Sequence, residues 1–460
     1  MVFFEQYSPG TSNNGYIWSN ERCDKPVFTM PSGFYTGTLD LNFKDPAPND
    51  TIYYSLNGSE PSRLSNFYAP GSSISLAITT VVRAACFSKD KLSSDPVTKT
   101  FLINEHDTHL PIVSLVTTPD NLTSNTIGIY INGTGSTPNY NQYWQRPANM
   151  ELIDTTKVTC VSQEIDMSIS GAYSRSIDQK TLSLSPAKKF GDSQFRYEFF
   201  KASKPGMKYK EIRLRNSGND FFFSMMRDAF SQSLVMHRMD IDLQAYEPAV
   251  LYLNSAYYGI MNLRGVTSKD YIYSNYGIEN EDIEEFINYH IAQIYEANTD
   301  WPWNNVKIWK KKRDGKWRWM MYDTDMTFNF KDNQQNYNTL LYALGEHPTD
   351  KLSDWCNLLI RRLIQNKEFQ KKFVDRFCVQ ISTTFTTDRV NAIMDSLSGK
   401  ISEDIIFHKK RWAGSNRTLV DDLKLMKVFS AGRPDKMMNF LSNRFEDSVS
   451  IQTVHISSLI

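Results

Sequence analysis

The feature that most constrains the fold is a change of sequence pattern near residue 105. Before it, short runs alternate apolar and polar side chains between turn-forming residues, which is typical of half-buried strands. After it, strand-like runs mix with helical patterns, and the last part of the chain is rich in helical ones. Since 460 residues exceed what one ordinary hydrophobic core serves, we expect several parts. These are an N-terminal segment at 1–24, a small β domain at 25–104 and a larger α+β domain at 109–460.

The overall charge excludes some classes of partner. Lysine plus arginine and aspartate plus glutamate each number 51, so the formal net charge is zero. A neutral chain has no general attraction for nucleic acid, and any phosphate binding must come from local side chains. No apolar run is long enough to span a bilayer, so we expect no transmembrane segment. The five cysteines form no C-x-x-C pair, which favours isolated thiols over a disulfide framework or a zinc site.

The small domain is expected to be an immunoglobulin-like antiparallel sandwich. Strands are predicted at 38–43, 52–56, 74–76 and 80–87, and the Asn57-Gly58 pair is a favoured hairpin turn. Short strands at such regular spacing are typical of a sandwich.

Three motifs in this region resemble a known module. They are F-T-M-P-S-G-F-Y, I-Y-Y-S-L-N-G-S-E-P-S and T-V-V-R-A-A-C, and they resemble the chitobiase/hexosaminidase C-terminal sandwich. The resemblance implies an accessory role and leaves carbohydrate open as a partner of the sandwich. Tyr53, Tyr54 and Tyr68 would stack on sugars if exposed, but packing inside the sandwich is the favoured interpretation.

The stretch at 298–325 carries the most chemical information. Asp300 lies in a loop after a predicted helix, and Asn305 follows five positions later. Two strand-like runs at 306–311 and 316–321, joined by Asp314-Gly315, then lead into Asp323. Protein kinases need this order: a carboxylate that accepts the proton of the attacking hydroxyl, then an asparagine and a second carboxylate that hold metal ions. The His-Arg before the catalytic aspartate and the D-F-G triplet of typical kinases are absent.

Each of these residues also has a purely structural interpretation. Asp300 alone fits a turn carboxylate beside Pro302, and Asn305 fits a loop cap. Asp323 and Asp325 are two apart, so on a strand both would project from one face. Two such carboxylates repel each other unless a cation lies between them, which favours a metal site.

A kinase also needs a lysine on a strand to hold nucleotide phosphates. Lys180 begins an alternating run and is our candidate, with Arg175 in the Ser/Gly-containing turn before it. Asp228, on a helix predicted at 221–236, is the expected ion-pair partner of Lys180. Met261 would contact adenine or belong to the core, and a core position is the better interpretation for it.

The larger domain resembles a known family over 109–445. The motifs are S-R-S-I-D-Q-K-T, L-R-N-S-G-N-D, A-V-L-Y-L-N-S-A-Y-Y-G-I-M-N-L-R, N-T-D-W-P-W-N-N-V-K-I-W and W-R-W-M-M-Y-D-T-D. Together they resemble the CotH (spore coat protein H) kinase-like family. Two departures stand out. Gly265 replaces a Glu that often follows N-L-R in the family, and the stretch at 278–283 is short.

The resemblance implies a bilobal, atypical protein-kinase-like domain at the cell surface or outside the cell. It would phosphorylate serines of a protein substrate with ATP and Mg²⁺ or Mn²⁺. Carried over by position, Asp300 is the catalytic residue, Asn305 and Asp323 are metal ligands, and Lys180 binds the nucleotide. Asp325 is expected to help hold the metal.

Two other classes of function stay open. The first is a non-catalytic pseudokinase, adhesion or coat protein, which the accessory sandwich favours. The second is a nucleotide-sugar glycosyltransferase in which Asp323-Thr324-Asp325 holds a metal. The spacing from Asp300 to Asn305 has no role in that second scheme, so it ranks behind the kinase.

Overall fold

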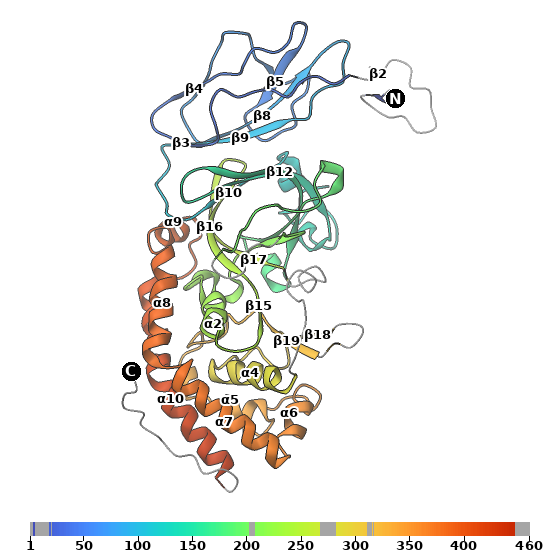
Figure 1. Cartoon of the computed structure of the whole chain (residues 1–460). Coiled ribbons are helices and arrows are strands. Elements are labelled where there is room, and N and C mark those ends of the chain that lie inside the picture. The colour runs from blue at the N-terminus through green and yellow to red at the C-terminus, as the bar shows by residue number, and fades with distance from the viewer. Residues whose placement is uncertain are drawn as a thin grey trace. The chain divides into compact units, whose positions relative to one another are not determined.

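The computed structural model describes residues 3–4, 18–19, 21–201, 208–266, 282–310, 315 and 317–446. The chain divides into two compact units. Unit 1 comprises Met1–Asn216, Glu247–Val266 and Ile406–Trp412, and unit 2 comprises Ser217–Tyr246, Thr267–Ile405 and Ala413–Ile460. Strands dominate the N-terminal half of the chain and helices the C-terminal half (Figure 1). The chain is therefore an α+β protein, as expected, whereas the kinase-like bilobal arrangement stays a prediction.

Besides the two-stranded sheet of β1 (Phe3–Phe4) and β2 (Trp18–Ser19), two small sheets form the N-terminal part of unit 1. A five-stranded sheet has the order β3-β9-β8-β5-β6, and β4 pairs with β7 in a second sheet. The bounds are β3 (Gly33–Tyr35), β4 (Leu39–Leu41), β5 (Thr51–Ser55), β6 (Asn66–Phe67), β7 (Ile74–Leu76), β8 (Thr80–Phe87) and β9 (Val97–Ile103). The four predicted strands match β4, β5, β7 and β8 within a few residues.

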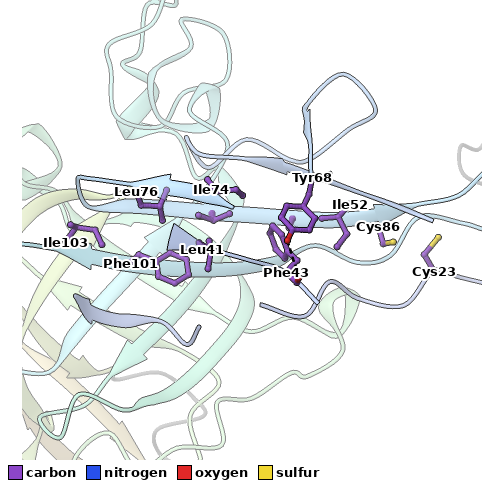
Figure 2. Close-up of a cluster of buried hydrophobic side chains, with 12 residues drawn as sticks. Cys23, Leu41, Phe43, Ile52, Tyr68, Ile74, Leu76, Cys86, Phe101 and Ile103 are labelled. Atoms are coloured by element: carbon purple, nitrogen blue, oxygen red, sulfur yellow. Dashed lines mark hydrogen bonds between the residues drawn. The ribbon is translucent and has the colours of Figure 1, made fainter. Parts of the chain in front are cut away.

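A compact apolar core belongs to these two sheets (Figure 2). Tyr68 is 4% exposed and belongs to that core, and Tyr54 packs against it. The Tyr53 ring contacts the Phe87 ring edge-on at 5.4 Å. All three tyrosines thus make packing contacts inside the small domain, which supports the structural interpretation of them.

The sandwich is joined to the rest of unit 1 by buried polar contacts. Glu151 is fully buried on β11 (Gln145–Ile153), and the Ser32 hydroxyl donates to both of its carboxylate oxygens at 2.8 and 3.0 Å. Lys99 on β9 lies 3.7 Å from the same carboxylate. Burial raises the pKa of Glu151, and the hydrogen bonds and Lys99 oppose that rise. Residues of the sandwich thus provide hydrogen-bond and ion-pair partners for the Glu151 carboxylate on β11.

Gly58 lies at another close contact. Its φ is +86°, and an added Cβ would lie 2.7 Å from the Thr117 carbonyl oxygen. Gly58 is therefore needed both for its backbone conformation and for space. The Asn57-Gly58 pair does not form the predicted hairpin turn by itself, because residues 56–65 connect β5 to its partner β6.

Beyond the sandwich, seven strands close into a barrel in the order β10-β11-β12-β13-β14-β17-β16. The further bounds are β10 (Ile112–Val116), β12 (Thr159–Ser170), β13 (Thr181–Ser185), β14 (Ile212–Arg215), β16 (Tyr246–Leu253) and β17 (Ala256–Gly265). Short helical turns connect them: α1 (Asp120–Thr123), η1 (Asn139–Asn141), η2 (Tyr173–Ser176) and η3 (Lys188–Phe190). β16 and β17 are joined by a tight turn in which Asn254 and Ser255 both have positive φ.

Unit 2 is mostly helical. Its helices are α2 (Arg227–Val235), α4 (Asp282–Tyr295), α5 (Thr339–Ala343), α6 (Leu358–Leu363), α7 (Lys367–Thr383), α8 (Thr387–Ile401) and α10 (Leu419–Phe445), with η4 (Gly218–Phe222) and η5 (Gln334–Asn336). α9 (Ile405–Arg411) lies mainly in unit 1. None of the helices described here is both long and apolar enough to cross a membrane.

The prediction of one continuous helix over 221–236 is wrong. The chain forms η4, leaves the helical conformation at Met225 (φ +64°) and starts again as α2 at Arg227. Asp220 explains the break, because its carboxylate accepts from the main-chain N–H groups of Ser224 and Arg227 at 3.1 and 3.0 Å. The side chain thus satisfies donors at the start of α2, which no helical partner can reach.

A three-stranded sheet in unit 2 has the order β15-β19-β18, with β15 (Asp242–Leu243), β18 (Lys307–Lys310) and β19 (Trp317–Met321). The Asp242 carboxylate accepts from Trp309 on β18 and from Arg318 on β19, so it fixes the hairpin from one side. The predicted turn contains Asp314, which lies outside the described residues, as does most of the stretch at 278–283.

Candidate active site

The loop after α4 holds the predicted catalytic carboxylate in place. The Asn298 side-chain oxygen accepts from the Asp300 main-chain N–H at 3.0 Å. Asp300 Oδ2 accepts from Asn305 Nδ2 at 2.8 Å and from Asn304 Nδ2 at 3.3 Å. Within the described residues, both amide contacts fall on the same carboxylate oxygen. Neither of these two amides contacts the other carboxylate oxygen, Oδ1.

Asn305 also reaches the third member of the site. Its Nδ2 donates to the Asp323 main-chain oxygen at 3.3 Å, so one amide touches both Asp300 and Asp323. Asn305 and Asp323 each have a φ of +55°. Asn and Asp tolerate this left-handed region better than most residues do. The predicted spacing therefore brings Asp300, Asn305 and Asp323 together in unit 2.

The electrostatics of the site suit a cation. The pKa of Asp300 is raised, first by burial and then by the nearby Asp323 charge, while its amide contacts oppose the rise. The two acids are thus close enough to repel each other, and a bound cation would relieve that repulsion. The Asn305 amide nitrogen makes these two contacts, so its side-chain oxygen is the atom of this residue that could bind a cation. Carboxylate and amide oxygens are ligands that Mg²⁺ prefers, so this donor set fits such an ion.

Asp325 has different surroundings. The prediction that Asp323 and Asp325 project from one face of a strand is wrong, because β19 ends at Met321 and Asp323 lies in a left-handed turn. Asp325 is fully buried, and its carboxylate accepts from the Asn219 main-chain N–H at 2.8 Å. Among the described residues, it does not join Asp300 and Asp323 in a cluster of three closely spaced carboxylates. Its contacts are those of a residue that positions the turn.

Asp228 on α2 lies directly behind the same turn. Its carboxylate accepts from the Thr324 N–H at 2.8 Å, from the Thr324 hydroxyl at 3.0 Å and from Gln232 at 3.0 Å. The expected partner Lys180 belongs to the other unit. The observed contacts give Asp228 a role in holding the backbone between Asp323 and Asp325.

Two residues of the site were not found by sequence reasoning. Gln334, which is 3% exposed, donates to the Ala297 and Met326 carbonyls and to the Thr299 hydroxyl, so it joins the loops that carry Asp300 and Asp323. Asn219 supplies the N–H that binds Asp325. No periodicity marks Gln334, whereas Asn219 lies in the quoted L-R-N-S-G-N-D motif.

A cavity of about 980 Å³ opens beside the catalytic loop in unit 2. Thr299 and Trp303, which flank Asp300 in sequence, line it together with Lys331 and Tyr342. Lys331 lowers the pKa of Asp300, and Asp300 in turn contributes to the raised pKa of Tyr342, which is due first to burial. The cavity therefore lies within electrostatic reach of the Asp300 carboxylate.

Lys180 lies in unit 1, directly before β13. It is 4% exposed, and its ammonium donates to the carbonyls of Arg175 and Ile177 at 2.8 and 3.1 Å. The same nitrogen lies 4.3 Å from the centre of the Tyr140 ring, a contact that the sequence did not suggest. Burial lowers the pKa of Lys180. The nearby Asp178 charge opposes this lowering.

The residues around Lys180 are held by a network of buried hydrogen bonds. Gln179 donates to the Tyr258 and Ile260 carbonyls on β17, and Thr181 donates to the Asn216 side chain at 2.9 Å. The Tyr258 hydroxyl accepts from the Lys180 main-chain N–H at 3.0 Å. This network restricts the position of the Lys180 backbone, as a binding residue requires.

The two other nucleotide candidates also lie in unit 1. The Arg175 guanidinium donates to the Gly171 and Tyr140 carbonyls at 2.7 and 2.8 Å, so Arg175 organises the turn around Lys180. Met261 on β17 is fully buried, which fits the core position that the sequence favoured for it.

Replacing Lys180 by alanine is expected to weaken ATP binding at least about tenfold, because one charge-assisted phosphate contact is removed. Lys188 is the matched control, since it is an exposed lysine on η3 of the same unit. Titration calorimetry with ATP and Mg²⁺ checks both variants, and thermal melting checks that each remains folded. Equal losses of affinity in Lys180→Ala and Lys188→Ala would contradict the role of Lys180.

Comparison with known proteins agrees with both resemblances. No curated protein sequence matches the chain. The family model for the chitobiase/β-hexosaminidase C-terminal domain matches residues 30–98. The family model described as CotH kinase protein matches residues 167–281 and 267–446, which is more than half of the 460 residues and includes the site around Asp300. The chain therefore belongs to the CotH kinase protein family.

Proposed function

We propose that this chain is an atypical protein kinase that transfers a phosphoryl group from ATP to serine hydroxyls of a protein substrate. One observation carries the proposal. The Asn305 amide contacts both the Asp300 carboxylate and the Asp323 main chain, so the three predicted residues share one site. Membership of the CotH kinase protein family supports the same reaction class.

Each residue has a defined role in the proposed reaction. Asp300 accepts the proton of the serine hydroxyl through Oδ1, while its Oδ2 is fixed by the amides of Asn304 and Asn305. Asn305 and Asp323 would hold Mg²⁺ or Mn²⁺, which would neutralise phosphate charge when bound. Asp228 and Asp325 position the backbone on either side of Thr324.

The residues of unit 1 would bind the nucleotide. Lys180 would donate to the phosphates, with Arg175 holding the turn before it. We assign no separate adenine contact to Met261, because its side chain is buried among the strands of unit 1.

The cavity beside Asp300 is the proposed entry for the acceptor serine. Lys331 and Lys351 are balanced by Asp332 and Asp350 among its lining residues, and Trp303 offers a half-exposed ring. A lining without excess charge suits a serine in a neutral stretch of polypeptide. The proposed location, at the cell surface or outside the cell, rests on the name of the family as a coat protein.

The test is a transfer assay with γ-labelled ATP, the full chain, Mg²⁺ or Mn²⁺ and a serine-rich acceptor protein. We expect label on the acceptor or on the chain itself, and none when a chelator removes the metal. ATP binding that depends on metal, but without transfer, would favour a pseudokinase. Neither binding nor transfer would favour an adhesion or coat protein. Transfer of sugar from a sugar nucleotide would replace the proposal with a glycosyltransferase.

A further inference from the structure

Two cysteines that are far apart in the sequence meet at one end of the sandwich core. Cys23 and Cys86 are 4% and 3% exposed. Figure 2 shows their sulfur atoms on neighbouring side chains beside Ile52. The Cys23 sulfur, the Cys86 sulfur and a carboxylate oxygen of Asp50 all lie within 4.8 Å of one another.

Main-chain hydrogen bonds hold both cysteines in this arrangement. The Cys23 N–H donates to the Leu92 carbonyl at 2.9 Å, and the Leu92 N–H donates to the Glu21 carbonyl at 3.0 Å. Cys86 lies on β8, and its N–H donates to the Ser94 hydroxyl at 2.8 Å. The Ser94 N–H donates back to the Cys86 carbonyl at 2.9 Å. These hydrogen bonds fix both backbones and hold the two sulfurs close together. A disulfide requires such closeness between its two cysteines.

We propose that Cys23 and Cys86 form an intrachain disulfide when the chain folds in an oxidising compartment. In the reaction, the two thiols lose two protons and two electrons, and one S–S bond forms between them. Oxidised glutathione is the oxidant, and it is reduced to two molecules of glutathione that take up those protons. The disulfide covalently attaches the strand-free segment around Cys23 to the central strand β8.

A metal ion is the alternative occupant, and the contacts favour it less. Structural zinc sites are almost always four-coordinate, whereas the cluster among the described residues offers three ligands. The Lys91 ammonium lies 3.3 Å from Asp50 and already provides this carboxylate with a positive charge. The two sulfurs lie within 4.8 Å of each other and need no further ligand to form a disulfide.

The surroundings also indicate when oxidation takes place. Burial is the main cause that raises the pKa of Cys23, and it raises the pKa of Cys86 to about 12. Since the thiolate is the reactive form, the folded, reduced pair reacts slowly. The bond therefore forms during folding, while oxidant still reaches both sulfurs.

The other cysteines provide internal controls. Cys160 is exposed, and its thiol lies 3.2 Å from the Asp154 carboxylate, while Cys356 and Cys378 are partly exposed. Peptide mapping without reduction, on full chain produced in an oxidising compartment and blocked in denaturant with N-ethylmaleimide, is the experiment. We expect one cross-linked peptide pair containing Cys23 and Cys86, and three blocked cysteines.

Thermal melting with and without reductant adds a second readout. Reduction is expected to lower the melting temperature of the sandwich by roughly 10 °C, because the cross-link closes a long loop of the unfolded chain. Cys160→Ala should keep this response, whereas Cys23→Ala should lose it whatever its own melting temperature. The response to reductant thus distinguishes the loss of the disulfide from a general loss of stability caused by the substitution.

Three results would overturn the inference. All five cysteines could react with N-ethylmaleimide, Cys86 could be found linked to another cysteine, or a stoichiometric metal could be present with both thiols free after chelation. The inference does not depend on kinase activity, so its failure would leave the transfer assay unaffected.

Discussion

Asp300→Asn is expected to lower the rate of phosphoryl transfer by roughly 10³-fold, because a general base contributes about 10²–10⁴-fold. The substitution keeps the shape of the side chain and removes the group that accepts the proton. Binding of ATP with Mg²⁺ should stay within about threefold, since Asn305 and Asp323 are unchanged. Single-turnover transfer and titration calorimetry, measured on the same preparation, check the two halves of this expectation.

Asp435→Asn is the control for Asp300→Asn. Asp435 is an exposed acid on α10 and lies outside the site, so its loss should leave transfer unchanged. If Asp300→Asn kept full transfer, the proton would go elsewhere and the catalytic role of Asp300 would be lost. If Asp300→Asn abolished ATP binding instead, the main role of Asp300 would be to bind the metal ion.

Asp323→Asn is expected to weaken Mg²⁺-dependent ATP binding by about 100-fold or more, because a metal ligand loses its charge. Asparagine is a better choice than alanine, since Asp323 has a φ of +55° and Asn tolerates that conformation. Calorimetry with ATP in the presence and absence of Mg²⁺ checks the expectation. The difference in ATP affinity with and without Mg²⁺ should be nearly abolished in the variant.

Asp325→Asn is the matched control for Asp323→Asn. Asp325 is buried against Asn219, so its substitution should lower the melting temperature of the protein more than it changes metal dependence. Unchanged ATP binding in Asp323→Asn, with a loss in Asp325→Asn, would show that the metal site is misplaced by two residues.

The sequence was sufficient to predict features that depend on local chemistry. Short strand-like runs between turn residues predicted β4, β5, β7 and β8, and the helix predicted before Asp300 corresponds to α4. The Asp300 to Asn305 spacing could be interpreted because both residues lie in one short loop.

Features that depend on long-range contacts were missed. Helix propensity gave no sign of the break before α2, because the break is caused by the Asp220 side chain replacing main-chain partners. Alternation predicted an extended Asp323, whereas Thr324 binds Asp228 on a distant helix and the chain turns there. The meeting of Cys23 and Cys86 depends on how a segment lies on a sheet, which spacing alone does not record.

The contacts of Glu151 indicate that the sandwich stabilises the barrel next to it. Ser32 and Lys99, which belong to the sandwich, satisfy a carboxylate that sits on a barrel strand. Removing residues 25–104 would take away both of these partners and expose the carboxylate to water. The sandwich therefore helps to stabilise β11, and we expect a shortened chain that begins at residue 109 to be less stable than the full chain.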